Sequence, residues 1–137
     1  MYTISVRREF SAQHFMIGGD FGPENEKHSH HYRAEVELSG ENLDQFGFLM
    51  DITEIEKRLD EVVGVFRDQT LNDLTEFGGL NPSLERFTKV FCLLFANQVQ
   101  YTRIHTILIR IWENENAWAS YQADLLQLRS RNMPRMA

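Results

Sequence analysis

The sequence predicts an α+β fold in which two helices cover one face of a four-stranded antiparallel sheet. Apolar and polar residues alternate near both ends of the chain, as they do in strands that bury one face. In the middle of the chain, apolar residues recur at helical spacing in two segments. The resulting order, ββααββ, favours a two-layer sandwich, because each helix has one apolar stripe to bury against the sheet.

The first two strands are expected over residues 2–14 and 28–38. The apolar face of the first is interrupted only at Arg8, and the second ends at Gly40. The connection between them, residues 17–26, is rich in glycine, proline and asparagine and predicts a loop. Two strands joined in this way form an antiparallel pair, so the long connection is a candidate functional loop.

Two helices follow. Asp51 is expected to cap the first, and Glu54 lies three residues further on, the spacing of a capping box. An apolar stripe then continues to Phe66. Pro82 is expected in the first turn of the second helix, where proline is tolerated because the amide there has no intrahelical partner. The stripe of this second helix runs to Gln98.

The last two strands are expected over residues 107–113 and 117–123, with a turn at residues 114–116. No repeat, linker or low-complexity segment interrupts the pattern. A length of 137 residues suits one hydrophobic core rather than two. We therefore expect a single domain over residues 1–137.

The composition disfavours several classes of partner. The chain has 14 Lys+Arg against 20 Asp+Glu, a formal net charge of −6, whereas nucleic-acid binding needs clustered basic residues. The basic tail residues Arg129, Arg131 and Arg135 are a local exception, interpreted as a solubilising end. The longest apolar run, residues 90–96, is far shorter than the roughly 20 residues that cross a bilayer. Neither nucleic acid nor membrane is expected as a partner.

The expected location is the cytoplasm. The only cysteine, Cys92, cannot form a disulfide within the chain, which fits a reducing compartment. At the N-terminus the charged residues follow the apolar ones, which is not the order found in a signal peptide.

Three histidines are candidate metal ligands. His28 and His30 are separated by one residue, so both project from the same face of their strand. His14 ends the preceding strand, on a face that can meet them across the antiparallel pair. Three converging imidazoles suit Zn²⁺ and leave a fourth position for water or substrate, as in catalytic zinc sites. The alternative, a chance run of polar histidines on an exposed edge strand, stays open at this point.

These histidines lie in motifs that resemble those of a known family. The segments Phe10-Ser11-Ala12-Gln13-His14-Phe15 and His28-Ser29-His30-His31-Tyr32 resemble the F-x-A-x-H and H-G-H-N-Y motifs of the 6-pyruvoyl-tetrahydropterin synthase family. That family includes the 6-carboxytetrahydropterin synthase of queuosine biosynthesis. Further segments resemble family motifs in the same order: Gly47–Asp51, Leu71-Asn72, Asn81–Glu85 and Ile111–Glu113.

The resemblance implies the tunnelling fold, in which trimers close their sheets into a twelve-stranded barrel and commonly pair as hexamers. It implies zinc bound by His14, His28 and His30, and substrate sites at subunit interfaces. It also implies that Glu113 anchors a pterin. A pterin presents its N3–H and 2-amino groups as two parallel donors, which one carboxylate accepts bidentately.

The sequence departs from the family at its catalytic positions. The spacing of the common bacterial form places the family's catalytic cysteine at Glu24. A glutamate-bearing variant of the family cleaves the side chain of dihydroneopterin triphosphate, and the usual position of its glutamate is Asn25 here. Glu24 and Glu26 therefore flank that position, and both are candidate bases. The family's Asp-His pair appears as Asp68-Gln69, which leaves Asp68 as a weaker candidate because glutamine carries no proton at neutral pH.

The two remaining histidines have no matching catalytic role. His31 is expected to face away from the metal and to be structural. His105 shares the facing of Glu113 and is only a remote candidate for an acid or base.

Three hypotheses follow. The leading one is a zinc-dependent pterin lyase or synthase that acts on dihydroneopterin triphosphate or a related pterin, with Glu24 or Glu26 in place of the cysteine. The second is a non-catalytic pterin- or purine-binding metalloprotein. The third is a structural oligomer in which zinc ties two strands together, and the presence of Glu113 argues against it.

Overall fold

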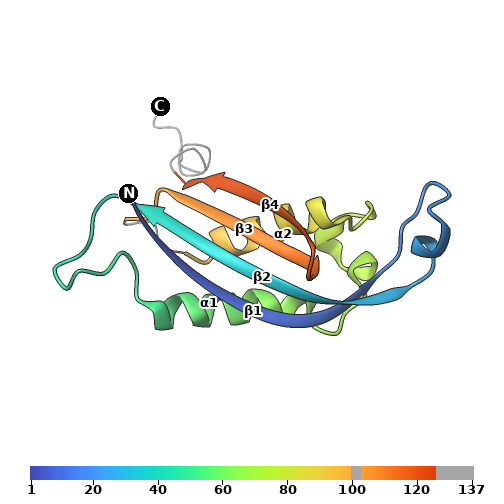
Figure 1. Ribbon diagram of the computed structural model, residues 1–137, viewed down its shortest axis with the longest axis horizontal. Coiled ribbons are helices and arrows are strands. Elements are labelled where there is room, and N and C mark those ends of the chain that lie inside the picture. Colours follow the sequence, from blue (N-terminus) through green and yellow to red (C-terminus); the bar gives the residue numbers. More distant parts are fainter. Residues whose placement is uncertain (100–102, 126–137) are drawn as a thin grey trace, which may run out of the picture.

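The computed structural model describes residues 1–99 and 103–125, and it confirms the predicted order of elements (Figure 1). The elements are β1 (Tyr2–His14), β2 (His28–Gly40), α1 (Ile52–Phe66), α2 (Leu84–Ala96), β3 (Thr106–Asn114) and β4 (Ala117–Asp124). A short 3₁₀ turn, Gly22–Asn25, lies in the connection between β1 and β2. The basic tail residues named above, Arg129, Arg131 and Arg135, lie outside the described residues.

The strands form one antiparallel sheet in the order β1-β2-β3-β4. β1 and β2 pair over their whole length, which sets His14 opposite His28. Pairing between β2 and β3 ends at Arg33 opposite Trp112. The first part of β2, residues 28–32, therefore extends past β3 together with the end of β1, as the long curved pair in Figure 1 shows. We call this part of the sheet the overhang.

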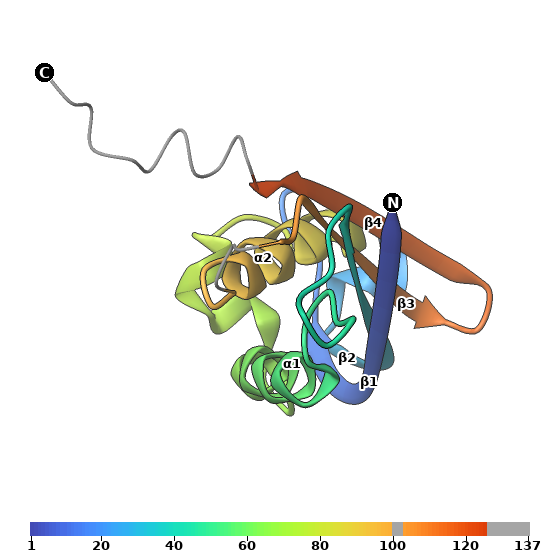
Figure 2. The same cartoon turned by 90° about the vertical axis from the view of Figure 1, so that its left-hand side faces the viewer.

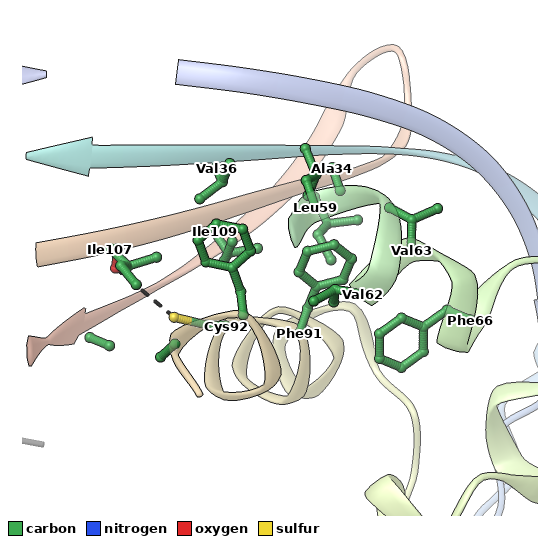
Figure 3. Close-up of a cluster of buried hydrophobic side chains, with 14 of the residues drawn as sticks. Ala34, Val36, Leu59, Val62, Val63, Phe66, Phe91, Cys92, Ile107 and Ile109 are labelled. Carbon is green, nitrogen blue, oxygen red and sulfur yellow. Dashed lines mark hydrogen bonds between the residues drawn. The ribbon is translucent and has the colours of Figure 1, made fainter. Parts of the chain in front are cut away.

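Both helices lie on the same face of the sheet, as the end view shows (Figure 2). Alternate residues of β2, from Tyr32 to Leu38, point toward them and are buried. Each helix buries its apolar stripe, and removing such surface from water stabilises the fold by about 25 cal/mol per Å². None of the helices in the described ranges is both long and apolar enough to cross a membrane. The core residues labelled in Figure 3 are Ala34, Val36, Leu59, Val62, Val63, Phe66, Phe91, Cys92, Ile107 and Ile109.

Cys92 belongs to this core. Its side chain is fully buried, and its thiol lies 4.0 Å from the carbonyl oxygen of Ile107 in β3 (Figure 3). Burial raises the pKa of the Cys92 thiol to about 12. The thiol therefore stays protonated at neutral pH and does not replace the family cysteine.

The start of α1 follows the prediction in part. Asp51 caps the helix by accepting a hydrogen bond from the amide of Thr53 at 2.9 Å. The Glu54 carboxylate instead pairs with Arg58 one turn further on, at 2.9 Å. The capping box that the spacing predicted is therefore not closed, because the arginine competes for the same carboxylate.

The prediction for Pro82 was wrong, because the proline precedes the second helix instead of occupying its first turn. Ser83 is the cap, accepting a hydrogen bond from the amide of Arg86 at 3.2 Å, and α2 begins at the next residue. The Pro82 carbonyl consequently lies outside the helix, where it accepts a hydrogen bond from His14.

The single charged residue on the helix-facing side of β1 pairs with α1. Arg8 contacts the carboxylates of Glu56 and Asp60, each at 2.8 Å. Such partly exposed ion pairs contribute about 0–1 kcal/mol each. Arg8 can therefore occupy the helix-facing side of β1, because its guanidinium pairs with partly exposed carboxylates of α1.

Candidate metal centre

Three histidines converge at the overhang. His14 is the last residue of β1 and stands opposite His28, the first residue of β2, while His30 stands opposite Ala12. Because alternate residues of a strand share a face, all three rings project to the side of the sheet that the helices cover. Their ring centroids are 4.6–4.9 Å apart. The structure brings together the three side chains that the sequence singled out as metal ligands.

Two of the rings are oriented by backbone carbonyls. His14 donates through Nδ1 to the Pro82 carbonyl at 3.0 Å, and His28 donates through Nδ1 to the Glu26 carbonyl at 2.7 Å. A proton on Nδ1 leaves the lone pair on Nε2, which is the arrangement of a metal-binding imidazole with its outer hydrogen bond. These bonds aim both Nε2 atoms at the centre of the cluster.

The free nitrogens form a donor set for a metal. The Nε2 atoms of His14, His28 and His30 are buried without a hydrogen-bond partner among the described residues. One ring nitrogen from each lies within 4.8 Å of the others. Burial lowers the pKa of His14 against the opposing effect of its bond to Pro82, which favours the neutral form that ligates metals. Three converging imidazoles whose Nε2 atoms lack a hydrogen-bond partner fit Zn²⁺.

Glu113 lies against this cluster. It occupies the end of β3, one residue beyond the last β2–β3 pair, and its side chain is 25% exposed. Its Oε1 atom lies 3.3 Å from Nε2 of His30 and 3.8 Å from Nε2 of His14. The sequence indicated the facing of this carboxylate, and the structure adds its proximity to two of the candidate ligands.

Glu24 lies near another histidine of the cluster, within the 3₁₀ turn of the loop. Its Oε2 atom lies 3.6 Å from Nε2 of His28, and its side chain is 52% exposed. Of the two glutamates that the sequence proposed as bases, Glu24 is therefore the one whose carboxylate reaches the histidines. Glu26 is exposed and contributes through its backbone carbonyl, which holds the His28 ring.

Asn25 explains why the glutamate that reaches the site is Glu24. Its side-chain amide donates to the carbonyls of Met16 and Gly19, at 3.0 and 2.9 Å, and accepts from the amide of Phe21 at 2.7 Å. The amide of Met16 also donates to the Glu24 carbonyl at 2.8 Å. The side chain of Asn25 is thus used in hydrogen bonds within the loop, and the carboxylate that lies near the histidines is that of Glu24.

Asp68 lies apart from the cluster in this chain. Its amide donates to the Ser11 carbonyl at 2.7 Å, and the following residues run beside β1, with Thr70 bridged to Gln13. This segment covers the outer edge of β1. The side chains of Asp68 and Gln69 are exposed there, and Asp68 makes no ion pair with a histidine of the cluster. Asp68 also has a left-handed backbone, with φ of 59°, a conformation that is uncommon outside glycine.

His31 and His105 lie away from the centre. His31 projects from the other face of the sheet, where its ring lies 3.3 Å from the Ser11 hydroxyl and 3.6 Å from the Glu9 carboxylate. His105 pairs through its amide with Ser39, at the opposite end of β2 from the histidine cluster.

Two asparagines anchor the loop to the body of the protein, and sequence reasoning did not assign them this role. Asn72 pairs its side chain with both backbone groups of Phe15, at 3.0 and 2.8 Å. Asn81 does the same to Ile17, at 2.7 and 2.9 Å. Each side-chain amide therefore makes the two hydrogen bonds, one accepted and one donated, that a neighbouring strand would make. Their place in the Leu71-Asn72 and Asn81-Pro82 motifs was the available signal, but nothing local indicated the partner.

Tyr32 lies next to His30 on the same face of β2 and was also not assigned a role from sequence. It is 1% exposed, and its ring lies 5.6 Å from that of His30 and 6.3 Å from that of His14. Burial raises the pKa of its phenol well above the usual range, and the charges of Glu113 and Glu24 raise it further. The phenol therefore stays neutral, and its ring packs beside those of His30 and His14.

A cleft of about 400 Å³ opens beside the centre, where β2 runs past the end of β3. His30, Glu113, Trp112 and Arg33 are among the residues that line it. This volume lies within the range of small-molecule sites. The cleft reaches the centre at His30 and Glu113, and it continues past the end of β3 to His31 and Glu9 on the open face of the sheet.

Comparison with solved structures shows the same fold. The 6-pyruvoyl tetrahydropterin synthase of Caenorhabditis elegans matches with a TM-score of 0.79 and 20% identity, over 90% of this chain and 96% of that one. The enzyme of Plasmodium falciparum matches with 0.74 and 14%, over 90% and 98%. A Plasmodium vivax 6-pyruvoyltetrahydropterin synthase, a variant with a catalytic glutamate replaced by alanine, matches with 0.72 and 11%, over 90% and 99%.

No curated protein sequence matches the chain significantly. The family model for 6-pyruvoyl tetrahydropterin synthase matches residues 3–124, which include both strands of the histidine centre, both helices and the β3–β4 hairpin. Together with the sheet of four antiparallel strands under two helices, this match shows that the chain belongs to the 6-pyruvoyl tetrahydropterin synthase family and has its tunnelling fold.

Proposed function

We propose that the protein is a zinc-dependent pterin synthase or lyase that acts on dihydroneopterin triphosphate or a related pterin. Products of the 6-pyruvoyl- or 6-carboxytetrahydropterin type are expected. The observation that carries the proposal is the centre itself, in which three orphaned imidazole nitrogens lie between two carboxylates beside a cleft.

The metal would be held by His14, His28 and His30. When bound, zinc supplies a Lewis acid that polarises oxygen atoms on the substrate side chain. Pro82 and the Glu26 carbonyl keep the rings of His14 and His28 in the orientation that this role needs.

Glu24 is the proposed base. Its carboxylate lies beside the centre, and the hydrogen bonds of Asn25 hold its turn in place. It would accept a proton from the substrate side chain, the task that the family cysteine performs. The glutamate described as catalytic in the Plasmodium vivax protein supports the idea that a carboxylate can serve as a catalytic group on this fold.

Glu113 is the proposed pterin anchor. Its carboxylate borders the cleft and can accept two parallel donors from a pterin ring. Each hydrogen bond to a charged group in a desolvated site is worth roughly 1.5–3 kcal/mol.

The decisive experiment supplies dihydroneopterin triphosphate to the zinc-loaded protein and identifies the product by mass spectrometry. We expect a pterin with a shortened or rearranged side chain. A second candidate function, a non-catalytic pterin- or purine-binding metalloprotein, is favoured by Gln69, which removes the family's proton-carrying histidine. Pterin binding without any product would support that second function.

We further propose a homo-oligomer, a trimer or hexamer, located in the cytoplasm. The outer edge of β4 and much of that of β1 have no strand neighbour among the described residues. Pairing these edges between subunits would satisfy their backbone groups.

A further inference from the structure

The position of Glu113 relative to the histidines bears on the state of the site before substrate binds. A tetrahedral metal with ligands at about 2.0–2.1 Å sets neighbouring ligand atoms roughly 3.3–3.4 Å apart. The Glu113 Oε1 atom lies 3.3 Å from Nε2 of His30 and 3.8 Å from Nε2 of His14. It thus lies at or near ligand spacing from two of the three nitrogens.

The surroundings of Glu113 also favour a metal ion beside its carboxylate. The carboxylate is three-quarters buried, and its ion-pair contacts within the described residues are to His30 and His14, with no lysine or arginine among them. Arg33, which also lines the cleft, contacts Glu9. A buried carboxylate without a cationic side chain is unfavourable unless another positive charge balances it.

Glu24 differs in both respects. Its carboxylate is half-exposed and lies near one histidine nitrogen, at 3.6 Å. It gains less from a bound cation because water can solvate it. Of the two glutamates beside the histidines, Glu113 is the better placed to complete a coordination shell.

We propose that Glu113 is the fourth ligand of the metal before a pterin binds, and that the pterin draws this carboxylate away from the metal. The inference rests on the proposed metal site and deepens it. The Glu113 carboxylate cannot bind the metal and accept both pterin hydrogen bonds at the same time without weakening one of these interactions. The metal is therefore closed to other ligands until the substrate ring arrives, and its fourth position then opens for the substrate side chain.

The test uses Co²⁺ as the metal, because its visible spectrum reports ligand changes, and azide as a small probe of an open position. We expect azide to bind the Co²⁺ protein weakly, and to bind the Glu113→Ala protein at least about tenfold more tightly. Zn²⁺ affinity, measured by competition with a chromophoric chelator, should fall about tenfold or more in Glu113→Ala. Adding neopterin to the parent protein should strengthen azide binding, because the two ligands then favour the same open state.

Glu24→Gln is the matched control, since it also removes a negative charge beside a histidine of the centre. It should leave azide binding close to that of the parent. Equal strengthening in the two variants would mean that only the local charge matters and would overturn the proposal, as would unchanged azide binding in Glu113→Ala. Glu113→Gln, which keeps the size of the side chain, provides the same readout if the alanine variant folds poorly.

The outcomes separate this inference from the proposed function. A parent protein that binds no Co²⁺ removes both the metal site and the fourth ligand. A parent protein that forms product while azide binds equally in all variants keeps the function and overturns the role of Glu113 at the metal.

Discussion

At the scale of single residues, the centre depends on which atom each side chain presents. The carbonyl oxygens of Pro82 and Glu26 accept hydrogen bonds from Nδ1–H of His14 and His28, which leaves Nε2 for a metal. The side-chain amide of Asn25 donates hydrogen bonds to carbonyls within the loop, and the neighbouring Glu24 places its carboxylate beside His28.

Replacing His28 with alanine should remove the metal and leave the secondary structure intact, because the core of sheet and helices does not include this ring. Metal analysis should find about one zinc per chain in the parent and almost none in His28→Ala. His31→Ala, which alters the opposite face of the sheet, is the control and should keep its zinc. Full zinc in His28→Ala would contradict the ligand assignment.

Replacing Glu24 with glutamine should abolish turnover and preserve binding of zinc and pterin, because the amide keeps the size and loses the proton-accepting charge. Steady-state kinetics and isothermal titration separate the two effects. Glu26→Gln should remain active, since the hydrogen bonds of Glu26 with Pro23 and His28 are made by its backbone amide and carbonyl. If a protein that carries both Glu24→Gln and Glu26→Gln is as active as the parent, neither glutamate is the base. Asp68 would then be the next candidate to test.

Replacing Glu113 with glutamine should weaken pterin binding much more than folding. A glutamine amide offers one acceptor and one donor group to a ring edge with two donors, so one pairing becomes repulsive. A loss of roughly 1.5–3 kcal/mol in binding is expected, with a thermal midpoint close to that of the parent. Equal pterin affinity in the two proteins would remove Glu113 from the ring-binding role.

At the scale of elements, the loop between β1 and β2 is held by side-chain amides in place of a strand partner. Asn72 and Asn81 pair with the backbone of Phe15 and Ile17, and Asn25 closes the tip. The loop can therefore be loosened without disturbing the apolar core, which lies between the helices and the sheet.

Asn25→Ala should lower turnover at least about tenfold while costing only about 1–2 kcal/mol of stability, because two of the three hydrogen bonds it removes are exposed and the third is only partly buried. Kinetics and denaturant unfolding provide the two numbers. The control is Asn42→Ala, in an exposed position of the loop after β2. If Asn25→Ala keeps full activity, the positioning of Glu24 by this residue is wrong.

At the scale of the whole molecule, the sheet has one face under helices and one open face. Polar and charged residues line the open face, where Arg110 contacts Glu35 at 2.6 Å and lies over the Trp118 ring at 4.8 Å. A sheet with a polar open face and two strand edges suits assembly by edge pairing, in which the open face lines an interior.

We expect the protein to sediment as a trimer or hexamer at micromolar concentration. Sites shared between subunits would also bring Asp68, on the edge of β1, close to a neighbouring subunit. Analytical ultracentrifugation measures the mass directly. A monomer at this concentration would contradict both the assembly and the shared site.

The sequence alone was sufficient for the order of elements and for the facing of most side chains. Strand alternation placed His28, His30 and Tyr32 on one face, and the cap at Asp51 marked the start of α1. These features are local, since they depend on residues a few positions apart. The same local reasoning misplaced Pro82 by treating it as helical.

The tertiary structure alone decided which of the candidate side chains lie within reach of one another. The register of β1 against β2 brought His14 to His28, the end of β3 brought Glu113 to His30, and the hydrogen bonds of Asn25 selected Glu24 over Glu26. Each of these depends on contacts between segments or on the path of a loop. Spacing along the chain indicates which side chains share a face, but the distances between them are set by packing and by the pairing of buried polar groups.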